Sequence, residues 1–413
     1  MKVAVVGGGV VGLATAFFLN ERGADVTVLE RDRCGEATSL GNAGWITPGV
    51  SSVPLAAPGV VPQALKWMVQ PDSPFYIRPR PSPALALWLL RFWRSSNEAR
   101  FKDGLSALVA LNAPVLDLLD HYRDRGVEFE MHAQGLLFPC LSRAAAEKDS
   151  ALYTKLSEAG YPGSHELLDG DEARALEPAL GDAVAAAVFS KDERHVRPET
   201  LTKGLAAYLA KHDATVLEQT PVETLTRTNG SWQLRTSAAT IDADAVVLAA
   251  GVWTQKLLRD VGYKLTILSG KGYSITFPDK TNLVRHPAYL SEAKVGVSPF
   301  EGGLRLAGTL ELTGIDTALR RRRLDALLNA ARRYLRDWRD EPERVDWAGL
   351  RPVVSDGLPV IGPVPGLEGL FVATGHGMVG VTMSAPTGDA LAELIVEKTK
   401  PARIAPFGLE RFH

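Results

Sequence analysis

The chain has 413 residues, of which 46% are hydrophobic and 23% are charged, and its formal net charge is −2. This length favours two or three domains, and the near-neutral charge excludes a long-range field that would attract nucleic acid. The two cysteines, Cys34 and Cys140, cannot form a disulfide framework, and no two histidines have metal-ligand spacing, so we expect no metal. No charged leader precedes the first strand and no apolar run reaches the roughly 18 residues of a membrane span, so we expect a cytoplasmic protein.

The chain starts with the pattern of a βαβ unit. Residues 2–6 are short, apolar and β-branched, which is typical of a buried parallel strand. Residues 10–22 predict a helix that ends at Gly23, and residues 25–30 predict a second strand. A nucleotide-binding fold is therefore expected from the first residues onward.

The next segments alternate between irregular and regular texture. Residues 48–83 are crowded with proline and glycine, which excludes a long helix or a central strand. Residues 84–125 have helical periodicity, and residues 165–210 mix helices with short strands. Three further strands are predicted, at Thr215–Val222, Trp232–Thr236 and Ala245–Ala249.

The last third returns to the nucleotide-binding pattern. Residues 263–310 predict antiparallel strands, at Leu265–Leu268, Gly272–Phe277 and Gly303–Ala307. A charged helix follows at 319–338, and the chain ends with a strand at 369–374, a glycine loop and a helix at 385–398. We therefore predict an α/β fold in which a Rossmann-like domain (1–50, 163–262 and 343–413) is interleaved with an α+β substrate domain (51–162 and 263–342) whose sheet is mostly antiparallel.

The first motif with a chemical meaning is the glycine run after the first strand. Gly7, Gly9 and Gly12 fit G-x-G-x-x-G: they suit a tight turn, the approach of a pyrophosphate and close helix packing. The helix that starts at Val10-Val11 would direct free N–H groups at the phosphates. Glu30 ends the second strand, where a carboxylate accepts from a ribose hydroxyl. The sequence therefore predicts a dinucleotide site.

Two later glycine-rich segments favour a flavin over a nicotinamide cofactor. The strand in Asp242–Gly251 ends in the small residues Ala250 and Gly251, as in flavoproteins where this strand passes the cofactor, and Val222 would offer backbone groups to the adenine. A loop near the C-terminus could bring N–H groups and a helix dipole to the pyrimidine end of the ring; it comprises Gly375, His376, Gly377, Met378, Val379, Gly380 and the nearby Thr382. A plain buried strand and a capped loop are the alternatives.

Arg351 is the candidate for substrate binding. It sits among apolar residues before Pro352, and a guanidinium in such a place needs a partner. A substrate carboxylate held by two parallel hydrogen bonds is one partner, and an internal ion pair, for example with Asp356, is the other.

These motifs together resemble the D-amino-acid oxidase family of FAD-dependent oxidoreductases. Within it, the chain looks most like bacterial D-amino-acid dehydrogenases of the small-subunit type. The resemblance runs in order along nearly the whole chain and is carried by Thr38-Ser39-Leu40-Gly41-Asn42-Ala43-Gly44, by Ala57-Pro58-Gly59 with Lys66-Trp67-Met68, by Lys271-Gly272-Tyr273-Ser274, and by Leu350-Arg351-Pro352 through Gly375-His376-Gly377.

The resemblance implies non-covalent FAD and hydride transfer from the substrate's α-carbon to flavin N5, with electrons passed on to a quinone or other carrier. It implies that Arg351 binds the substrate carboxylate, that Tyr273 closes over the ring and that His376 belongs to the site. The resemblance also implies that FAD contacts seven residues besides those named above, namely Arg31, Thr38, Ser39, Asn42, Ala43, Gly44 and Trp253. The partner is then a small amino acid. Oxidation of a secondary amine, glycine or D-hydroxyproline remains an alternative, because residues 45–50 differ from the pattern of alanine-active members. Oxidation of a 2-hydroxy acid on the same fold is a second alternative, since it would also use an arginine and FAD.

Residues 84–94 raise the question of membrane contact. Two tryptophans, a phenylalanine and four leucines stand beside Arg91 and Arg94, which share one helical face. Such a helix can lie in the headgroup region of a membrane, and a core helix of the substrate domain with two solvated arginines is the alternative reading.

Overall fold

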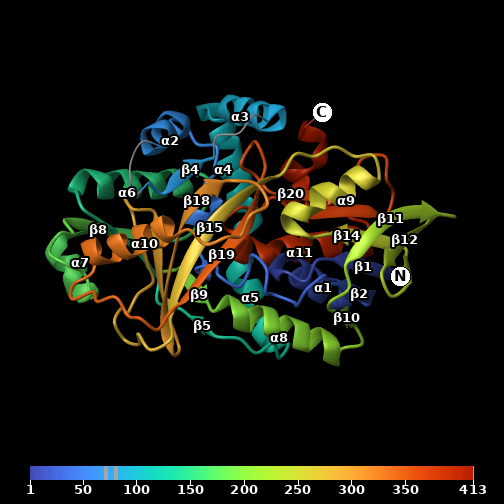
Figure 1. Ribbon diagram of the computed structural model, residues 1–413, viewed down its shortest axis with the longest axis horizontal. Helices are drawn as coiled ribbons and strands as arrows, with labels where there is room; N and C mark the ends of the chain where they lie inside the picture. The colour runs from blue at the N-terminus through green and yellow to red at the C-terminus, as the bar shows by residue number, and fades with distance from the viewer. Residues whose placement is uncertain (69–72, 79–81, 413) are drawn as a thin grey trace.

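The computed structural model describes residues 1–68, 73–78 and 82–412. Pro71, Pro79 and Pro81 of the proline-rich stretch lie outside these residues. Figure 1 shows two sheets side by side, with the N-terminal sheet on the right and the larger sheet on the left. The helices α2 (Val60–Met68) and α3 (Pro83–Ser95) lie above the larger sheet, at the top of the view.

The smaller sheet begins with the predicted βαβ unit. Its five parallel strands and one antiparallel edge strand run in the order β10 (Thr215–Leu217), β2 (Asp25–Leu29), β1 (Lys2–Val6), β14 (Ala245–Leu248), β21 (Leu370–Thr374) and β20 (Val360–Pro363). Short apolar runs form these strands because both faces of the sheet are covered. β1, β2 and α1 (Val10–Glu21) agree with the predicted unit.

Helices from distant parts of the chain cover this sheet. Phe17, on α1, belongs to a core that also contains residues of α4 (Glu98–Asn112), α5 (Val115–Asp124), α8 (Pro198–Lys211) and α11 (Gly380–Val396). α11 lies close to α1 because Gly388 has no side chain: a Cβ there would come within 2.7 Å of the Ala14 carbonyl carbon. α11 starts five residues before the predicted Ala385 and contains Pro386. The helix therefore begins immediately beside the glycine loop.

The larger sheet is mostly antiparallel, as predicted. Its order is β19 (Val345–Val353), β15 (Leu268–Phe277), β18 (Gly303–Leu312), β17 (Val295–Phe300), β16 (Ala288–Leu290), β6 (Leu136–Cys140), β8 (Ala186–Ser190) and β7 (His165–Asp169), with β4 (Phe75–Ile77) paired to β18. α10 (Arg321–Tyr334) packs on it, and α6 (Arg143–Glu158) and α7 (Gly170–Leu176) contact β7 and β8. Residues of β7, β8 and β19, assigned by sequence to the nucleotide-binding domain, thus pair within this sheet; the domain boundaries stay a prediction.

Two strand predictions were wrong in their limits. Thr215–Val222 is not one strand: Gln219, with φ +53°, turns the chain between β10 and β11 (Val222–Thr228), so Val222 begins a strand instead of ending one. Residues 265–267 do not form a strand, and β15 begins at Leu268 and runs without a break through Gly272.

The remaining elements are small. β11, β12 (Ser231–Thr236) and β13 (Thr240–Ala243) form one sheet, and β3 (Trp45–Ile46), β9 (Arg194–Val196) and β5 (Met131–His132) form another. α9 (Thr254–Asp260) and four 3₁₀ segments complete the described chain, at Val50–Ser52, Gly251–Trp253, Ala402–Phe407 and Leu409–Phe412. No helix in the described ranges combines the length and apolar character needed to cross a membrane.

Candidate functional site

The glycine run forms an open corner at the start of α1. Gly7 has φ +116°, and a Cβ on Gly12 would lie 1.9 Å from the Gly7 carbonyl oxygen, so both positions require glycine. A Cβ on Gly9 would meet only the Ser39 hydroxyl, at 3.6 Å. The space in front of Gly9 is therefore free for a phosphate group, as the sequence predicts.

Glu30 lies where the fingerprint predicts it. Its buried carboxylate accepts hydrogen bonds from Gly8 N (2.7 Å) and Asp32 N (2.9 Å), which holds it at the carboxyl end of β2. Next to it, the Arg31 guanidinium stacks on the Trp253 ring at 3.7 Å. Trp253 ends the 3₁₀ segment after β14 that also contains Gly251, and Thr374 donates to the Gly251 carbonyl oxygen at 3.0 Å. The ends of β1, β2, β14 and β21 thus converge, which fits the adenosine half of FAD.

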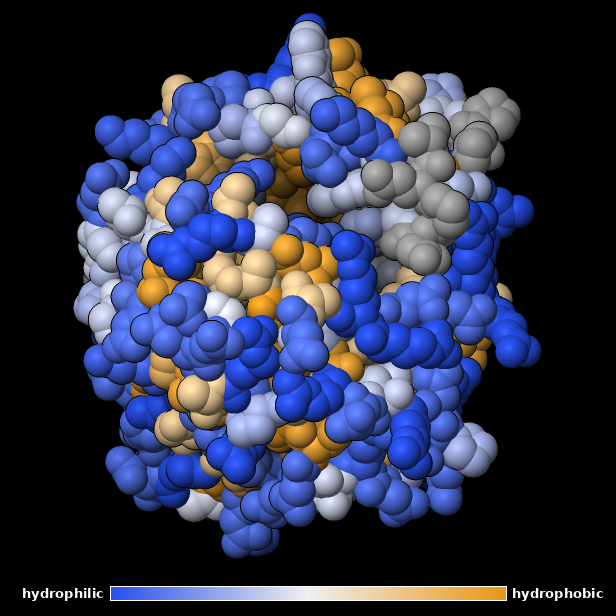
Figure 2. All heavy atoms as spheres, turned by 90° about the vertical axis from the view of Figure 1, so that its left-hand side faces the viewer, coloured by the Kyte–Doolittle hydropathy of each residue, from blue (hydrophilic) through white to orange (hydrophobic). Residues whose placement is uncertain are grey.

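A second group of predicted residues lines a cavity of about 630 Å³ between the two sheets. Figure 2 shows a hollow with apolar walls near the top of the face that it presents, in the region of α2. The sequence-predicted residues on the cavity wall are Thr38, Asn42, Ala43, Arg351, Gly375, His376, Gly377, Met378, Val379 and Thr382. The structure therefore brings the loop after β2 and the loop before α11 to one site.

Hydrogen bonds hold the two loops together. The Asn42 amide donates to the Met378 carbonyl oxygen at 3.0 Å and accepts from Gly44 N at 2.8 Å. The hydroxyls of Thr38 and Thr382 donate to the carbonyl oxygens of Leu350 and Trp45, respectively. The Ser39 hydroxyl accepts a hydrogen bond from Val10 N. Since Gly375 and Gly377 have positive φ angles, the loop before α11 needs glycine at both positions.

Arg351 is the most distinctive group in the cavity. It lies on β19, its Nη1 donates to the Thr309 carbonyl oxygen at 2.5 Å, and no carboxylate among the described residues forms an ion pair with it. Burial lowers its pKa to about 10, so it stays charged at neutral pH. The alternative ion pair is absent, since Asp356 binds Arg411 at 2.6 Å instead.

The neighbouring strand makes room for this guanidinium. A Cβ on Gly272 of β15 would lie 2.2 Å from the Arg351 Cζ. Tyr273, the next residue on β15, points to the other side, where its hydroxyl donates to Glu311 at 2.8 Å in a buried cluster with Arg323. Tyr273 does not line the cavity, so it does not cover the flavin ring as the resemblance implied. Its neighbour Gly272 contributes to the site instead, by leaving room for the Arg351 guanidinium.

His376 lines the cavity but is not an available base. Burial lowers its pKa to about 3, and its Nε2 lies 3.1 Å from the Thr387 hydroxyl. Its ring is thus neutral and already hydrogen bonded. Neither cysteine is a reactive thiolate, because burial raises the pKa of both Cys34 and Cys140 to about 12. Within the described residues, no group of three His, Cys, Asp or Glu side chains could hold a metal.

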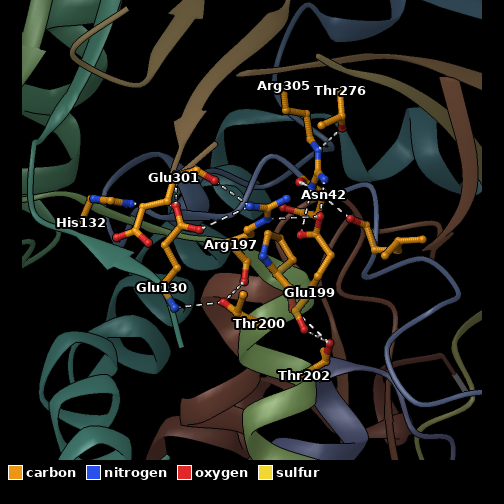
Figure 3. A network of polar contacts seen from close by, with 12 residues as sticks. Asn42, Glu130, His132, Arg197, Glu199, Thr200, Thr202, Thr276, Glu301 and Arg305 are labelled. Carbon is orange, nitrogen blue, oxygen red and sulfur yellow. Dashed lines mark hydrogen bonds and ion pairs between the residues drawn. The ribbon is translucent and has the colours of Figure 1, made fainter. Parts of the chain in front are cut away.

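Sequence reasoning missed Arg305, the residue that fixes the loop after β2. Arg305 of β18 is 3% exposed, and its Nη1 donates to the carbonyl oxygens of Leu40 (2.9 Å) and Asn42 (2.8 Å). Its other nitrogens bind Thr276 (2.9 Å) and the Glu199 carboxylate (2.5 Å). Figure 3 shows Arg305 above Asn42 and Glu199, with Arg197 on the other side of Glu199.

Sequence reasoning also missed aromatic residues of the cavity wall, namely Trp45, Phe138, Tyr153, Tyr289 and Trp347. They come from five separate elements, β3, β6, α6, β16 and β19. No spacing in the sequence links these residues. The one signal is a pair of glycines, Gly41 and Gly349, which leave room for the Trp347 ring. The cavity wall around the Arg351 guanidinium is therefore largely apolar.

Comparison with known proteins agrees with this geometry. A family model described as FAD dependent oxidoreductase matches residues 2–394. D-amino acid dehydrogenases from Bradyrhizobium diazoefficiens and Granulibacter bethesdensis are each 32% identical to this chain and cover 100% of it, with 99% and 100% of the relatives covered. The crystal structure of glycine oxidase from Geobacillus kaustophilus has a TM-score of 0.77 and 25% identity, covering 99% of this chain and 98% of that one. L-proline dehydrogenase from P. horikoshii, at a TM-score of 0.75 and 20% identity over 100% of this chain and 97% of that one, shares the fold.

Proposed function

Because this chain belongs to the FAD-dependent oxidoreductase family, we propose that it oxidises a D-amino acid, or a related small amino or imino acid, at the carbon that carries the amine. The observation that carries this proposal is Arg351, a half-buried cation without a counter-ion among the described residues, in a cavity built by the flavin-site loops. A carboxylate is the anion that a planar guanidinium binds through two parallel hydrogen bonds.

The residues divide into two tasks. Gly9, Glu30 and the start of α1 would hold the adenosine diphosphate part of FAD, and the loops containing Asn42 and Gly377 would hold the ring. FAD, when bound, supplies the two-electron chemistry by accepting a hydride from the α-carbon. Arg351 fixes the substrate carboxylate, and the apolar wall excludes water, so positioning supplies most of the catalysis.

The printed names of the relatives support an amine substrate, and so does the acid–base inventory. A 2-hydroxy acid needs a base for its hydroxyl, and His376 is too weak a base for that task. An α-amino acid needs only a neutral amine and an α-hydrogen aimed at the ring. The names of two relatives, of which 99% and 100% are covered, support the D configuration.

The test is a substrate panel with the purified flavoprotein and an artificial dye as electron acceptor. D-amino acids should be oxidised, and L-amino acids and 2-hydroxy acids should be slower by at least an order of magnitude. Glycine, sarcosine and D-hydroxyproline belong in the panel. If one of them is oxidised faster than the other D-amino acids, the protein is instead a glycine or secondary-amine enzyme. Turnover of 2-hydroxy acids alone would contradict the proposal.

We propose that FAD is held without a covalent bond. Cys34 and Cys140 are both protonated thiols at neutral pH, and neither lines the cavity. Acid precipitation should therefore release the yellow colour into the supernatant, and colour that stays in the pellet would contradict non-covalent binding.

We further propose that the electron acceptor is a quinone or another carrier at a membrane surface. The two helices at the top of Figure 1 carry exposed apolar side chains, namely Leu65 and Met68 of α2 and Leu87, Leu90 and Trp93 of α3. Arg91 and Arg94 also lie on α3, and with Arg100 of α4 they line a separate groove; none of the three has an ion pair among the described residues. Apolar side chains beside free arginines suit an anionic membrane surface.

The structure corrects the face of α3 that such contact would use. Trp88 is 4% exposed and stacks on Phe92 at 5.2 Å, so it belongs to the protein core. A Leu87→Gln, Leu90→Gln, Trp93→Gln variant should lose flotation with anionic liposomes, whereas wild type should float. The matched control is Ile315→Gln, Leu319→Gln, which removes exposed apolar groups elsewhere. A wild type that never floats, and that reduces oxygen as fast as the dye, would be a soluble oxidase.

A further inference from the structure

We infer that the wall beyond Arg351 is a side-chain pocket for an aromatic or large aliphatic substituent, so that the preferred substrate has a bulky apolar side chain. This inference rests on the proposed function, because it assumes that the substrate carboxylate binds Arg351. Four aromatic rings carry it, since Trp45, Tyr289, Phe138 and Tyr153 line the cavity in one continuous run.

The rings contact one another edge to face, which is the favoured geometry of aromatic pairs. The centroid distances are 5.6 Å from Trp45 to Tyr289, 6.0 Å from Tyr289 to Phe138 and 5.6 Å from Phe138 to Tyr153. Aliphatic side chains complete this part of the wall, among them Val50, Val53, Leu152 and Leu156. A guest ring would find mainly apolar partners on this wall.

Neighbouring groups hold the first ring in place. The Trp45 indole donates to the Ser298 hydroxyl at 2.9 Å, and that hydroxyl donates to the Ala43 carbonyl oxygen at 2.7 Å. A Cβ on Gly296 would lie 2.7 Å from the Trp45 ring, so the strand β17 leaves space for the indole by carrying glycine there. The wall is therefore preformed, which lowers the entropic cost of binding.

Tyr289 connects the wall to Arg351. Both side chains line the cavity. Burial raises the pKa of the Tyr289 phenol, and the Lys294 and Arg351 cations act to lower it. The phenol hydroxyl has no hydrogen bond with any described residue, and the ring contacts both Trp45 and Phe138. A carboxylate on Arg351 would lie in the same cavity as this ring, and the inferred pocket requires its α-substituent to extend toward the ring.

Two charged residues also line the cavity and define the competing possibility. The Lys294 ammonium lies 5.2 Å from the Tyr289 centroid, and the Asp149 carboxylate lies 3.7 Å from the Cys140 sulfur. Lys294 would favour a second carboxylate on the substrate, whereas Asp149 would repel it. The two side chains have opposite signs, and comparing succinate with 3-phenylpropanoate separates the effect of these charges from that of the apolar wall.

Binding of inert carboxylates to the FAD-loaded protein tests this inference without turnover. Acetate, hexanoate, 3-phenylpropanoate and succinate are titrated, and the change in the flavin absorbance spectrum gives each Kd. Burying the phenyl group should make 3-phenylpropanoate bind roughly 10- to 100-fold tighter than acetate, with hexanoate between them.

Two variants locate the pocket. Phe138→Ala should weaken 3-phenylpropanoate about tenfold and leave acetate unchanged. Leu152→Trp fills the same space from α6, and it should also weaken 3-phenylpropanoate, with less risk to folding because Leu152 is only half-buried. The matched control is Phe75→Ala, which truncates a ring at the α2 and α3 end of the same cavity and should change neither Kd.

The outcomes distinguish failure of the apolar pocket from failure of the carboxylate site at Arg351. Equal binding of acetate and 3-phenylpropanoate, or tighter binding of succinate, overturns the apolar pocket but keeps a carboxylate site. If no carboxylate perturbs the flavin, both the inference and the proposed carboxylate role of Arg351 fall. A preference that survives in Phe138→Ala and Leu152→Trp but disappears in Phe75→Ala places the pocket under α2 and overturns the assignment to the aromatic wall.

Discussion

Two arginines on the larger sheet differ in what satisfies their charge: the buried Arg305 is bound by the fold, whereas the half-buried Arg351 is available to bind a ligand. Arg305 on β18 and Arg351 on β19 lie on the two strands that flank β15. Arg305 donates to two carbonyl oxygens, a hydroxyl and a carboxylate, so the fold itself satisfies its guanidinium. Arg351 has one backbone partner and no counter-ion among the described residues.

The difference has a physical cause. A buried charge is tolerated only when paired or hydrogen bonded, so an unpaired one marks a position where another constraint outweighs stability. Arg305 closes the gap between the sheet and the loop after β2. Arg351 faces an apolar cavity in which a substrate anion would supply the missing partner.

The largest expected effect is that of Arg305→Met. This change leaves the Glu199 carboxylate and the carbonyl groups of Leu40 and Asn42 without their donor, which should lower the free energy of unfolding by roughly 3–5 kcal/mol. Denaturant unfolding of the FAD-loaded protein measures it. Arg197→Met is the matched control, because Arg197 also approaches Glu199, at 3.7 Å, but binds neither carbonyl (Figure 3).

A positioning role predicts more than lost stability. Arg305→Met should weaken FAD and alter the shape of the flavin absorbance bands, because the loop that it fixes contains Thr38 and Asn42. Arg305→Lys should recover part of both, since an ammonium can bind Glu199 but cannot span the two carbonyl groups. If Arg305→Met kept wild-type stability and FAD affinity, the two arginines would not differ in the way described.

The next effect is that of Arg351→Met, which should act on catalysis and not on folding. Loss of a desolvated contact to the substrate carboxylate should lower kcat/KM by about 100-fold. Stability should stay constant or rise, because the change removes a half-buried charge that has no counter-ion among the described residues. Arg351→Lys should recover only part of the activity. Steady-state kinetics and thermal unfolding of the same samples measure both, and an unfolded Arg351→Met would assign this arginine to structure.

The sequence predicted the parts of the molecule whose signals are local. The βαβ unit, the fingerprint glycines and Glu30 follow one another within 30 residues, and the structure has each where the pattern indicates it. Tyr273 fails for a physical reason. Successive residues of a strand point to opposite faces, and nothing in the sequence says whether Gly272 or Tyr273 faces the cavity. Long-range partners were beyond reach, since the Leu40 carbonyl that Arg305 binds is 265 positions away.

A buried carboxylate extends the comparison, because a carboxylate can become neutral by binding a proton, whereas arginine stays charged. Glu193 is fully buried without a cation: one oxygen accepts from Gly49 N (3.2 Å) and Tyr161 (3.0 Å), and the other has no partner among the described residues. Burial raises its pKa to about 8, against opposing hydrogen bonds from Tyr161 and Gly49. Glu193 therefore remains protonated where Arg351 has to stay charged.

This difference predicts a pH dependence of stability with a defined sign. The folded chain holds the Glu193 proton up to about pH 8, whereas the unfolded chain releases it near the ordinary value of 4.5. Between these values the unfolded state binds fewer protons, so the free energy of unfolding should fall as the pH rises, by at most about 1.4 kcal/mol per pH unit from this group. Glu193→Gln, which mimics the protonated acid, should remove this part of the slope. Thermal unfolding between pH 5 and pH 9 measures it as a Tm difference of a few degrees.

Glu177→Gln is the control with the opposite sign. Burial acts to raise the pKa of Glu177, but hydrogen bonds from His286, Ala179 and Arg285 outweigh it and hold that pKa below its ordinary value. The stability that Glu177 contributes is present above its unfolded pKa and is lost as the pH falls through its folded pKa, so this variant should be less stable throughout pH 5–9 and keep the wild-type slope. If wild type and Glu193→Gln lose stability in parallel as the pH rises, Glu193 is ionised in the folded protein. An unpaired charge such as that of Arg351 would then not indicate a ligand site in this protein.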